Sequence, residues 1–179
     1  MATRRQAREW AVQLLFQLDV NPREDQTPDE IFADFWEGQL RLRDEEKDDA
    51  KKIDVPDPHA RDFTESLVRG VMRNRDEIDK RLEARMPNWS VDRLGGEERA
   101  ILRMGTYELA FDPDPAPPAV VINEAVELIK IFTGVPVNHT CKAGNFVNGI
   151  LDAIARRQRS EKDKAKAKAE TWSPTGKPE

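Results

Sequence analysis

Apolar residues recur every three or four positions along most of the chain, which is the spacing of one face of an α-helix. No stretch alternates apolar and polar residues for long enough to indicate a β-strand. We therefore predict an all-α fold of about seven helices. The first two cover residues 3–20 and 27–51. The third carries Phe63, Leu67 and Val71; the fourth carries Ile78 and Leu82; the fifth runs from Gly96 to Phe111; the sixth carries Val121 to Phe132; the seventh carries Phe146 to Ile154.

Start signals support three of these helices. Two pairs of residues have the spacing of a capping box: Thr3 with Gln6, and Thr27 with Glu30. A third start is indicated by Asp57, which is followed at once by Pro58. The sequence therefore fixes where these helices begin more sharply than where they end.

The first helix carries arginines on its apolar side. At about 100° per residue, Arg4 and Arg8 fall inside the arc defined by Trp10, Leu14 and Leu18. A charge without a nearby carboxylate costs several kcal/mol to remove from water. We therefore expect the first turns to extend past the core, with their guanidinium groups exposed and available to an anion.

Charge is distributed unevenly along the chain. The formal net charge is −5, but residues 24–57 hold thirteen acidic and five basic side chains. The rest of the chain is therefore net positive, so the overall acidity does not exclude a nucleic-acid partner.

The two ends of the chain differ in composition. The apolar helical pattern indicates one domain over residues 1–158, within which the proline-rich segment 113–118 is a short stiff link and 134–144 is a loop. Residues 159–179 are rich in lysine and nearly free of apolar side chains, which predicts a disordered tail. That tail either keeps the protein soluble or adds nonspecific attraction to RNA.

The sequence lacks the residues that several kinds of site require. Cys141 is alone and only His59 and His139 accompany it, so we expect no disulfide and no zinc site. No apolar run is long enough to cross a bilayer. No constellation of side chains indicates catalysis, so we expect no enzyme activity and no cofactor, and a location in the reducing cytoplasm.

Four segments, in this order, together resemble one family. They are residues 3–16 (TRRQAREWAVQLLF), 98–109 (ERAILRMGTYEL), 120–130 (VVINEAVELIK) and 146–152 (FVNGILD). The sequence resembles the NusB family of bacterial transcription antitermination factors. The resemblance implies two packed three-helix bundles, with an arginine-rich RNA-binding motif on the N-terminal helix.

The resemblance also implies a function. Members of the family bind the single-stranded boxA element of ribosomal RNA leader transcripts together with a small-subunit ribosomal protein that serves as NusE. The pair joins the RNA polymerase antitermination complex, and a role in ribosome assembly is also attributed to the family. A similar domain precedes the catalytic domain of some ribosomal RNA methyltransferases, but this sequence carries no glycine-rich cofactor loop.

The family's functional positions fall on residues of this sequence. The RNA-binding positions correspond to Arg4, Arg5, Arg8, Gln13, Lys130, Lys142, Asn145, Phe146 and Asn148. The ribosomal-protein face corresponds to Glu98, with Glu97 and Tyr107 as neighbours. These cations neutralise at most about five phosphates, so we expect modest affinity for RNA and a need for the second protein.

Several alternatives stay open from the residues alone. Phe146 shares a stripe with Ile150 and Ile154, so packing in the core competes with stacking on a base. Glu108 lies on an apolar arc, where a structural role is more common than a catalytic one. Glu124 is expected to cap or pair locally. For the whole chain, the alternative to RNA binding is a helical scaffold whose arginines meet an acidic protein, and a homodimer is also possible.

Overall fold

The computed structural model describes residues 2–45, 56–87, 89–134 and 142–171, with only the helical backbone for 169–171. This part of the chain is all-α, as predicted. Its helices are α1 (Arg4–Val20), α2 (Pro28–Glu45), α3 (Pro58–Arg73), α4 (Arg75–Glu83), α5 (Gly96–Ala110), α6 (Pro118–Thr133) and α7 (Lys142–Thr171), with a short 3-10 helix at Val91–Arg93 before α5.

The predicted helix starts are confirmed. The hydroxyl of Thr3 accepts a hydrogen bond from the N–H of Gln6 at the start of α1. The carboxylate of Glu30 accepts one from the N–H of Thr27 at 2.7 Å, while Asp57 caps α3 through the N–H of Ala60. The predicted extension of the second helix to residue 51 lies outside the described residues.

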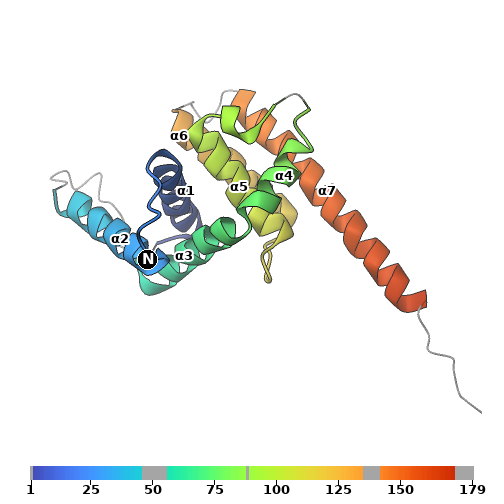
Figure 1. The fold of residues 1–179 in the computed structure, drawn as a ribbon, viewed down its shortest axis with the longest axis horizontal. Helices are drawn as coiled ribbons and strands as arrows, with labels where there is room; N and C mark the ends of the chain where they lie inside the picture. Colours follow the sequence, from blue (N-terminus) through green and yellow to red (C-terminus); the bar gives the residue numbers. More distant parts are fainter. Residues whose placement is uncertain (1, 46–55, 88, 135–141, 172–179) are drawn as a thin grey trace, which may run out of the picture.

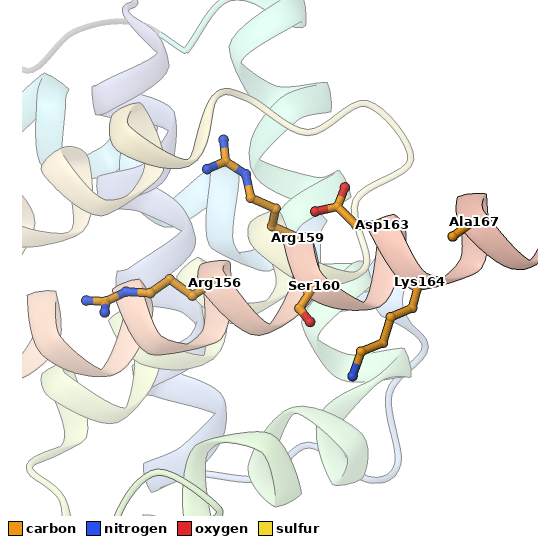
Figure 2. A pocket seen from close by; sticks show the side chains of 6 residues that line it. All are labelled: Arg156, Arg159, Ser160, Asp163, Lys164 and Ala167. Carbon is orange, nitrogen blue, oxygen red and sulfur yellow. The ribbon is translucent and has the colours of Figure 1, made fainter.

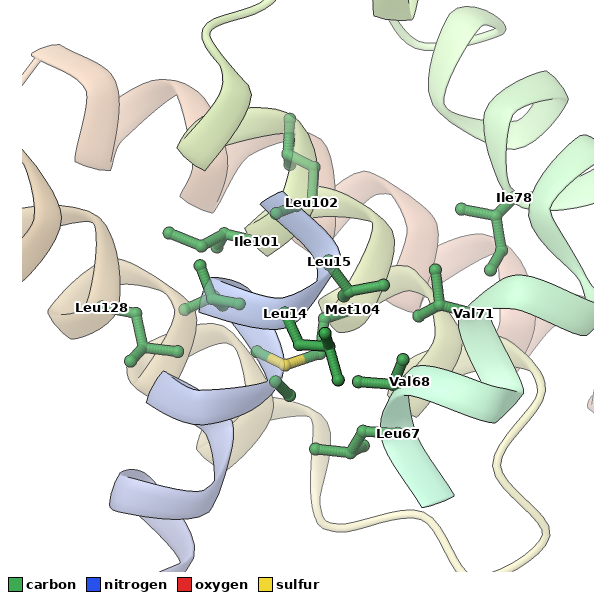
Figure 3. Packing of buried hydrophobic residues seen from close by; sticks show 14 of the residues in the cluster. Leu14, Leu15, Leu67, Val68, Val71, Ile78, Ile101, Leu102, Met104 and Leu128 are labelled. Carbon is green, nitrogen blue, oxygen red and sulfur yellow. The ribbon is translucent and has the colours of Figure 1, made fainter. Parts of the chain in front are cut away.

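The helices form two groups that share one core. Figure 1 shows α1, α2 and α3 at one end of the molecule and α5, α6 and α7 at the other. Helix α5 joins the groups, because it packs against α1 and α3 as well as against α4, α6 and α7. Figure 3 shows Leu14 and Leu15 of α1 in one cluster with Val68 of α3 and Met104 of α5.

Helix α2 attaches to this core through aromatic side chains. The rings of Trp10 and Trp36 meet edge to face, with centroids 5.5 Å apart. The indole N–H of Trp36 donates to Glu65 of α3 at 2.9 Å, so the polar atom of this buried ring is satisfied. Trp36 of α2 therefore contacts both α1 and α3.

One glycine allows α5 and α7 to approach closely. A Cβ added to Gly105 would lie 2.8 Å from a methyl carbon of Leu151. A side chain at this position would require the Leu151 side chain to shift. The close approach brings the beginning of α7 against the same core as α1.

The C-terminal part of α7 corrects a prediction. Residues 159–171 are helical, although their composition predicted disorder, while 172–179 lie outside the described residues. Lys, Ala, Arg and Glu are good helix formers, and Arg157 pairs with Glu161 one turn later at 2.7 Å. The absence of apolar side chains thus correctly predicted that this segment is not buried. The predicted disorder of its backbone was wrong, because residues 159–171 form a helix.

This extension is surrounded by solvent. Figure 1 shows it projecting beyond the other helices, and Figure 2 shows Arg159 and Asp163 on one side of α7 and Ser160 and Lys164 on the other. Among the side chains of α7 that the structure describes, the last buried one is Ile154. A second difference concerns the predicted loop 134–144, because α7 already begins at Lys142.

Candidate nucleic-acid interface

The first turn of α1 is fixed to the start of α3. Asp57 caps α3, and its other carboxylate oxygen accepts a hydrogen bond from the N–H of Ala2 at 3.1 Å. Together with the Thr3 cap, this contact sets the direction in which the arginines leave the helix. The cationic end of α1 is therefore an ordered part of the molecule.

Arg4 is exposed, as predicted, and lies beside an aromatic ring. Its guanidinium carbon is 4.8 Å from the centroid of the Phe63 ring on α3. Arg4 also lines two open depressions, one shared with Phe63 and one shared with Arg5 and Val120. A guanidinium beside one ring keeps its N–H groups available to a phosphate and its free face available to a base.

Arg5 is half-exposed and paired with a carboxylate of α6. Its Nε donates to Glu124 at 2.9 Å and its Nη2 donates to the other oxygen at 2.7 Å. The hydrogen bond from Arg5 lowers the pKa of Glu124, and the same bond raises the pKa of Arg5. The expectation that Glu124 pairs locally is therefore wrong, because its partner is 119 residues away.

The predicted exposure of Arg8 is also wrong. Arg8 is buried, and its guanidinium donates to Glu108 on α5 with N to O distances of 3.0 and 2.6 Å. The sequence argument considered only carboxylates nearby in the chain, whereas the fold supplies one 100 residues away. The same contact explains the buried Glu108, whose donor the sequence could not identify.

The first turns of α7 present a second group of predicted residues. Lys142, Asn145, Phe146 and Asn148 are all exposed, whereas Val147 is buried. Phe146 is 36% exposed, so it is not a core residue. The core alternative for Phe146 is thus wrong, and part of the residue is open to solvent.

The remaining predicted RNA contacts are already engaged within the protein. The ammonium group of Lys130 lies 2.8 Å from the carboxylate of Glu127 on the same helix. The side-chain carbonyl of Gln13 accepts a hydrogen bond from the amide of Gln39 at 3.2 Å, which directs Gln13 toward α2. Gln13 is therefore separated from the arginines at the start of α1.

The predicted ribosomal-protein face is divided. Glu97 and Glu98 are half-buried in the first turn of α5, but Tyr107 lies about 15 Å further along that helix at 1.5 Å per residue. Its ring packs over Gly70, where an added Cβ would lie 2.0 Å from the phenol ring carbon. Burial raises the pKa of Tyr107. Tyr107 is consequently not a neighbour of Glu97 and Glu98.

Sequence reasoning missed three side chains at this face. Phe63 supports Arg4, while Glu124 and Glu127 hold two of the predicted cations. The i,i+3 spacing of Glu127 and Lys130 was the one signal available for these contacts, since the others join different helices. Among the described residues no group of acidic, histidine or cysteine side chains could hold a metal ion.

Arginines clustered at one end of a helix are the electrostatic feature by which nucleic-acid-binding proteins are recognised. Residues 5–156 match the NusB family. The chain belongs to this family, as the sequence resemblance implied. In the part of the chain that the structure describes, no helix is long and apolar enough to cross a membrane.

Individual relatives agree with this assignment. The transcription antitermination protein NusB of Clostridium botulinum (strain Loch Maree / Type A3) is 34% identical over 148 residues, which cover 83% of this chain and 96% of that protein. NusB of T. maritima has a similar structure, with a TM-score of 0.63, 31% identity and coverage of 87% of this chain and 92% of that one.

A third relative was solved with partners. The crystal structure of the antitermination factors NusB and NusE in complex with double-stranded RNA contains a chain similar to this one. The TM-score is 0.62 and the identity 30%, with 86% of this chain and 96% of that chain covered.

Proposed function

We propose that this protein is a transcription antitermination factor that binds the boxA element of ribosomal RNA leader transcripts together with the small-subunit ribosomal protein that serves as NusE. The observation that carries the proposal is the exposed, ring-supported Arg4 at the start of α1 in a chain of the NusB family. The solved complex of a relative with NusE and RNA supports the same partners.

The RNA contacts follow from the predicted side chains that reach solvent, fully for Arg4 and Lys142 and in part for Arg5 and Lys130. Arg4, Arg5, Lys130 and Lys142 contact phosphates, Phe146 stacks on a base, and Asn145 and Asn148 donate to base edges or sugars. Arg8 acts indirectly, because its buried pair with Glu108 holds α1 against α5. Gln13 supports α1 from the side of α2 through Gln39.

The protein partner meets the start of α5. Glu97 and Glu98 present negative charge there, which suits a basic ribosomal protein. Tyr107 supports this helix from its buried side by packing on Gly70 of α3. We assign these roles to a domain of residues 1–158 in a cytoplasmic protein that binds RNA without transforming it, with residues 159–179 as an appendage.

Fluorescence anisotropy tests this function. The affinity is measured for a boxA-like oligomer and a scrambled oligomer, each as single strand and as duplex, with and without the ribosomal protein. With four cations and about 0.7 counterions released per contact, the logarithm of the affinity for the single strand falls with the logarithm of salt at a slope near −2.8. We expect tighter binding of the boxA-like strand, strengthened by the ribosomal protein.

Arg4→Ala provides the variant for this assay. We expect about a fivefold loss of affinity with an unchanged free energy of unfolding, because the side chain is exposed. Binding that is absent or independent of sequence, with and without the ribosomal protein, would instead support the helical scaffold.

A further inference from the structure

Two of the four cations assigned to RNA are held by carboxylates of one helix. Arg5 is bound by Glu124, and Lys130 is bound by Glu127. Glu124, Glu127 and Lys130 follow one another at three-residue spacing, which places them in a row along α6. The row therefore brings negative charge to the face that the proposed function assigns to phosphates.

The carboxylate of Glu124 uses the same donors that a phosphate would use. It accepts hydrogen bonds from Nε and Nη2 of Arg5, which is the paired geometry in which guanidinium groups bind both carboxylates and phosphates. A phosphate that approaches Arg5 must displace this carboxylate or lie beside a second negative charge. Either outcome weakens RNA binding.

Exposure separates this pair from the neighbouring one at Arg8. The side chains of Arg5 and Glu124 are 43% and 15% exposed and those of Lys130 and Glu127 are 19% and 25% exposed, whereas those of Arg8 and Glu108 are 4% and 2% exposed. Ion pairs that reach solvent contribute little net stability, so a phosphate is able to replace one partner. The buried pair of Arg8 is not exchangeable in this way.

We propose that Glu124 and Glu127 compete with RNA phosphates for Arg5 and Lys130 and so limit the affinity of this face for RNA. This inference rests on the proposed function. In this proposal the two glutamates determine affinity although neither contacts a base. The competition also accounts for the modest affinity that we expect of this face in the absence of the ribosomal protein.

Glutamine variants test the competition. Glu124→Gln and Glu127→Gln keep the size of the side chain and remove its charge, and Glu77→Gln is the matched control. Glu77 pairs with Arg81 on α4, so the control removes one charge and one surface ion pair away from the RNA face. Affinity for the boxA-like strand is measured by anisotropy at two salt concentrations, and folding is checked by thermal unfolding.

We expect Glu124→Gln to bind the single strand about three- to tenfold more tightly than the unchanged protein, and Glu127→Gln about two- to fivefold. The control changes affinity less than twofold. Adding Arg5→Ala to Glu124→Gln removes the gain, because the released cation is then missing. Glu127→Gln tests the competition at the second ion pair, Lys130–Glu127. If one of the two glutamine variants fails to fold, the other still tests the inference.

Two results overturn the inference alone. Affinities equal to that of the Glu77→Gln control would show that the carboxylates do not compete, and weaker binding would show that they position Arg5 and Lys130 for RNA. If the unchanged protein binds no RNA in the presence of the ribosomal protein, the proposed function fails and this inference fails with it.

Discussion

The guanidinium of Arg8 on α1 is bound by the carboxylate of Glu108 on α5, and both side chains are withdrawn from solvent. The contact joins the two helical groups at the point where α1 crosses α5. Each residue alone would be an unpaired charge in an apolar environment. Together they allow the cationic end of α1 to lie on the core.

Removing one partner of this pair destabilises the protein. We expect Arg8→Ala and Glu108→Gln each to lower the free energy of unfolding by about 3–5 kcal/mol, because the remaining group loses its buried partner. Urea unfolding measures the change. The double variant Arg8→Met with Glu108→Leu replaces the pair by apolar side chains and should recover much of the loss. Unaltered stability of Arg8→Ala would contradict a structural role for this arginine.

The fold could be predicted from local patterns, and the reason is visible at particular residues. Thr3 and Glu30 act as caps within their own turns, so the sequence contains both partners of each contact. The spacing of Leu14, Leu67 and Met104 likewise indicates which faces are buried. The helix at 159–171 was missed because lack of burial was taken to mean lack of helix.

The site was less predictable because its contacts join distant segments. Arg8 and Glu108 each stood out on an apolar arc, but pairing them requires the packing of α1 on α5. The bond between Arg5 and Glu124 likewise depends on where α6 lies. Ile150 and Ile154 are buried, as their stripe indicated, but Phe146 on the same stripe lies in the first turns of α7 and stays exposed, which the spacing alone does not reveal.

The second prediction concerns Asp19 and the loss of stability at acidic pH. It accepts hydrogen bonds from Arg75, Arg99 and Arg103, and so joins the end of α1 to α4 and α5. Burial alone would raise the pKa of Asp19, but the hydrogen bond from Arg99 and the charges of all three arginines together lower it. We expect Asp19→Asn to reduce the free energy of unfolding by about 3 kcal/mol at neutral pH.

The sign of the pH dependence follows from the lowered pKa of Asp19. A carboxyl that is more acidic in the folded state contributes stability above its ordinary pKa and loses it as the pH falls through the lowered value. The free energy of unfolding is measured from neutral pH into this acidic range. It should fall more steeply with decreasing pH for the unchanged protein than for Asp19→Asn. Parallel curves would show that the three arginines do not stabilise the carboxylate.

A substitution of Phe146 is expected to change RNA affinity without changing stability. Because its side chain is exposed, Phe146→Ala should leave the melting temperature nearly unchanged while it weakens binding of the boxA-like strand about tenfold, through the loss of one stacked base. Val147→Ala is the matched control, since Val147 is the next residue along α7 but is fully buried, so its truncation lowers stability. A large drop in the stability of Phe146→Ala, with unchanged affinity, would restore a packing role.

The projecting end of α7 tests where the folded domain stops. Deletion of everything after Arg159 removes only exposed side chains among the described residues, so we expect the free energy of unfolding to change by less than about 0.5 kcal/mol. Deletion from Ile154 onward is the contrasting variant, because Ile154 is buried, and it should be clearly less stable.

RNA binding by the shorter of these deletions should depend on salt. The removed segment carries five lysines and four acidic side chains, so its contribution comes from the lysines by electrostatic attraction and fades as ionic strength rises. We expect affinity to fall about two- to fourfold at low salt and to match that of the full chain at high salt. A loss that persists at high salt would instead place a specific RNA contact on the extension and move the boundary of the functional domain beyond residue 158.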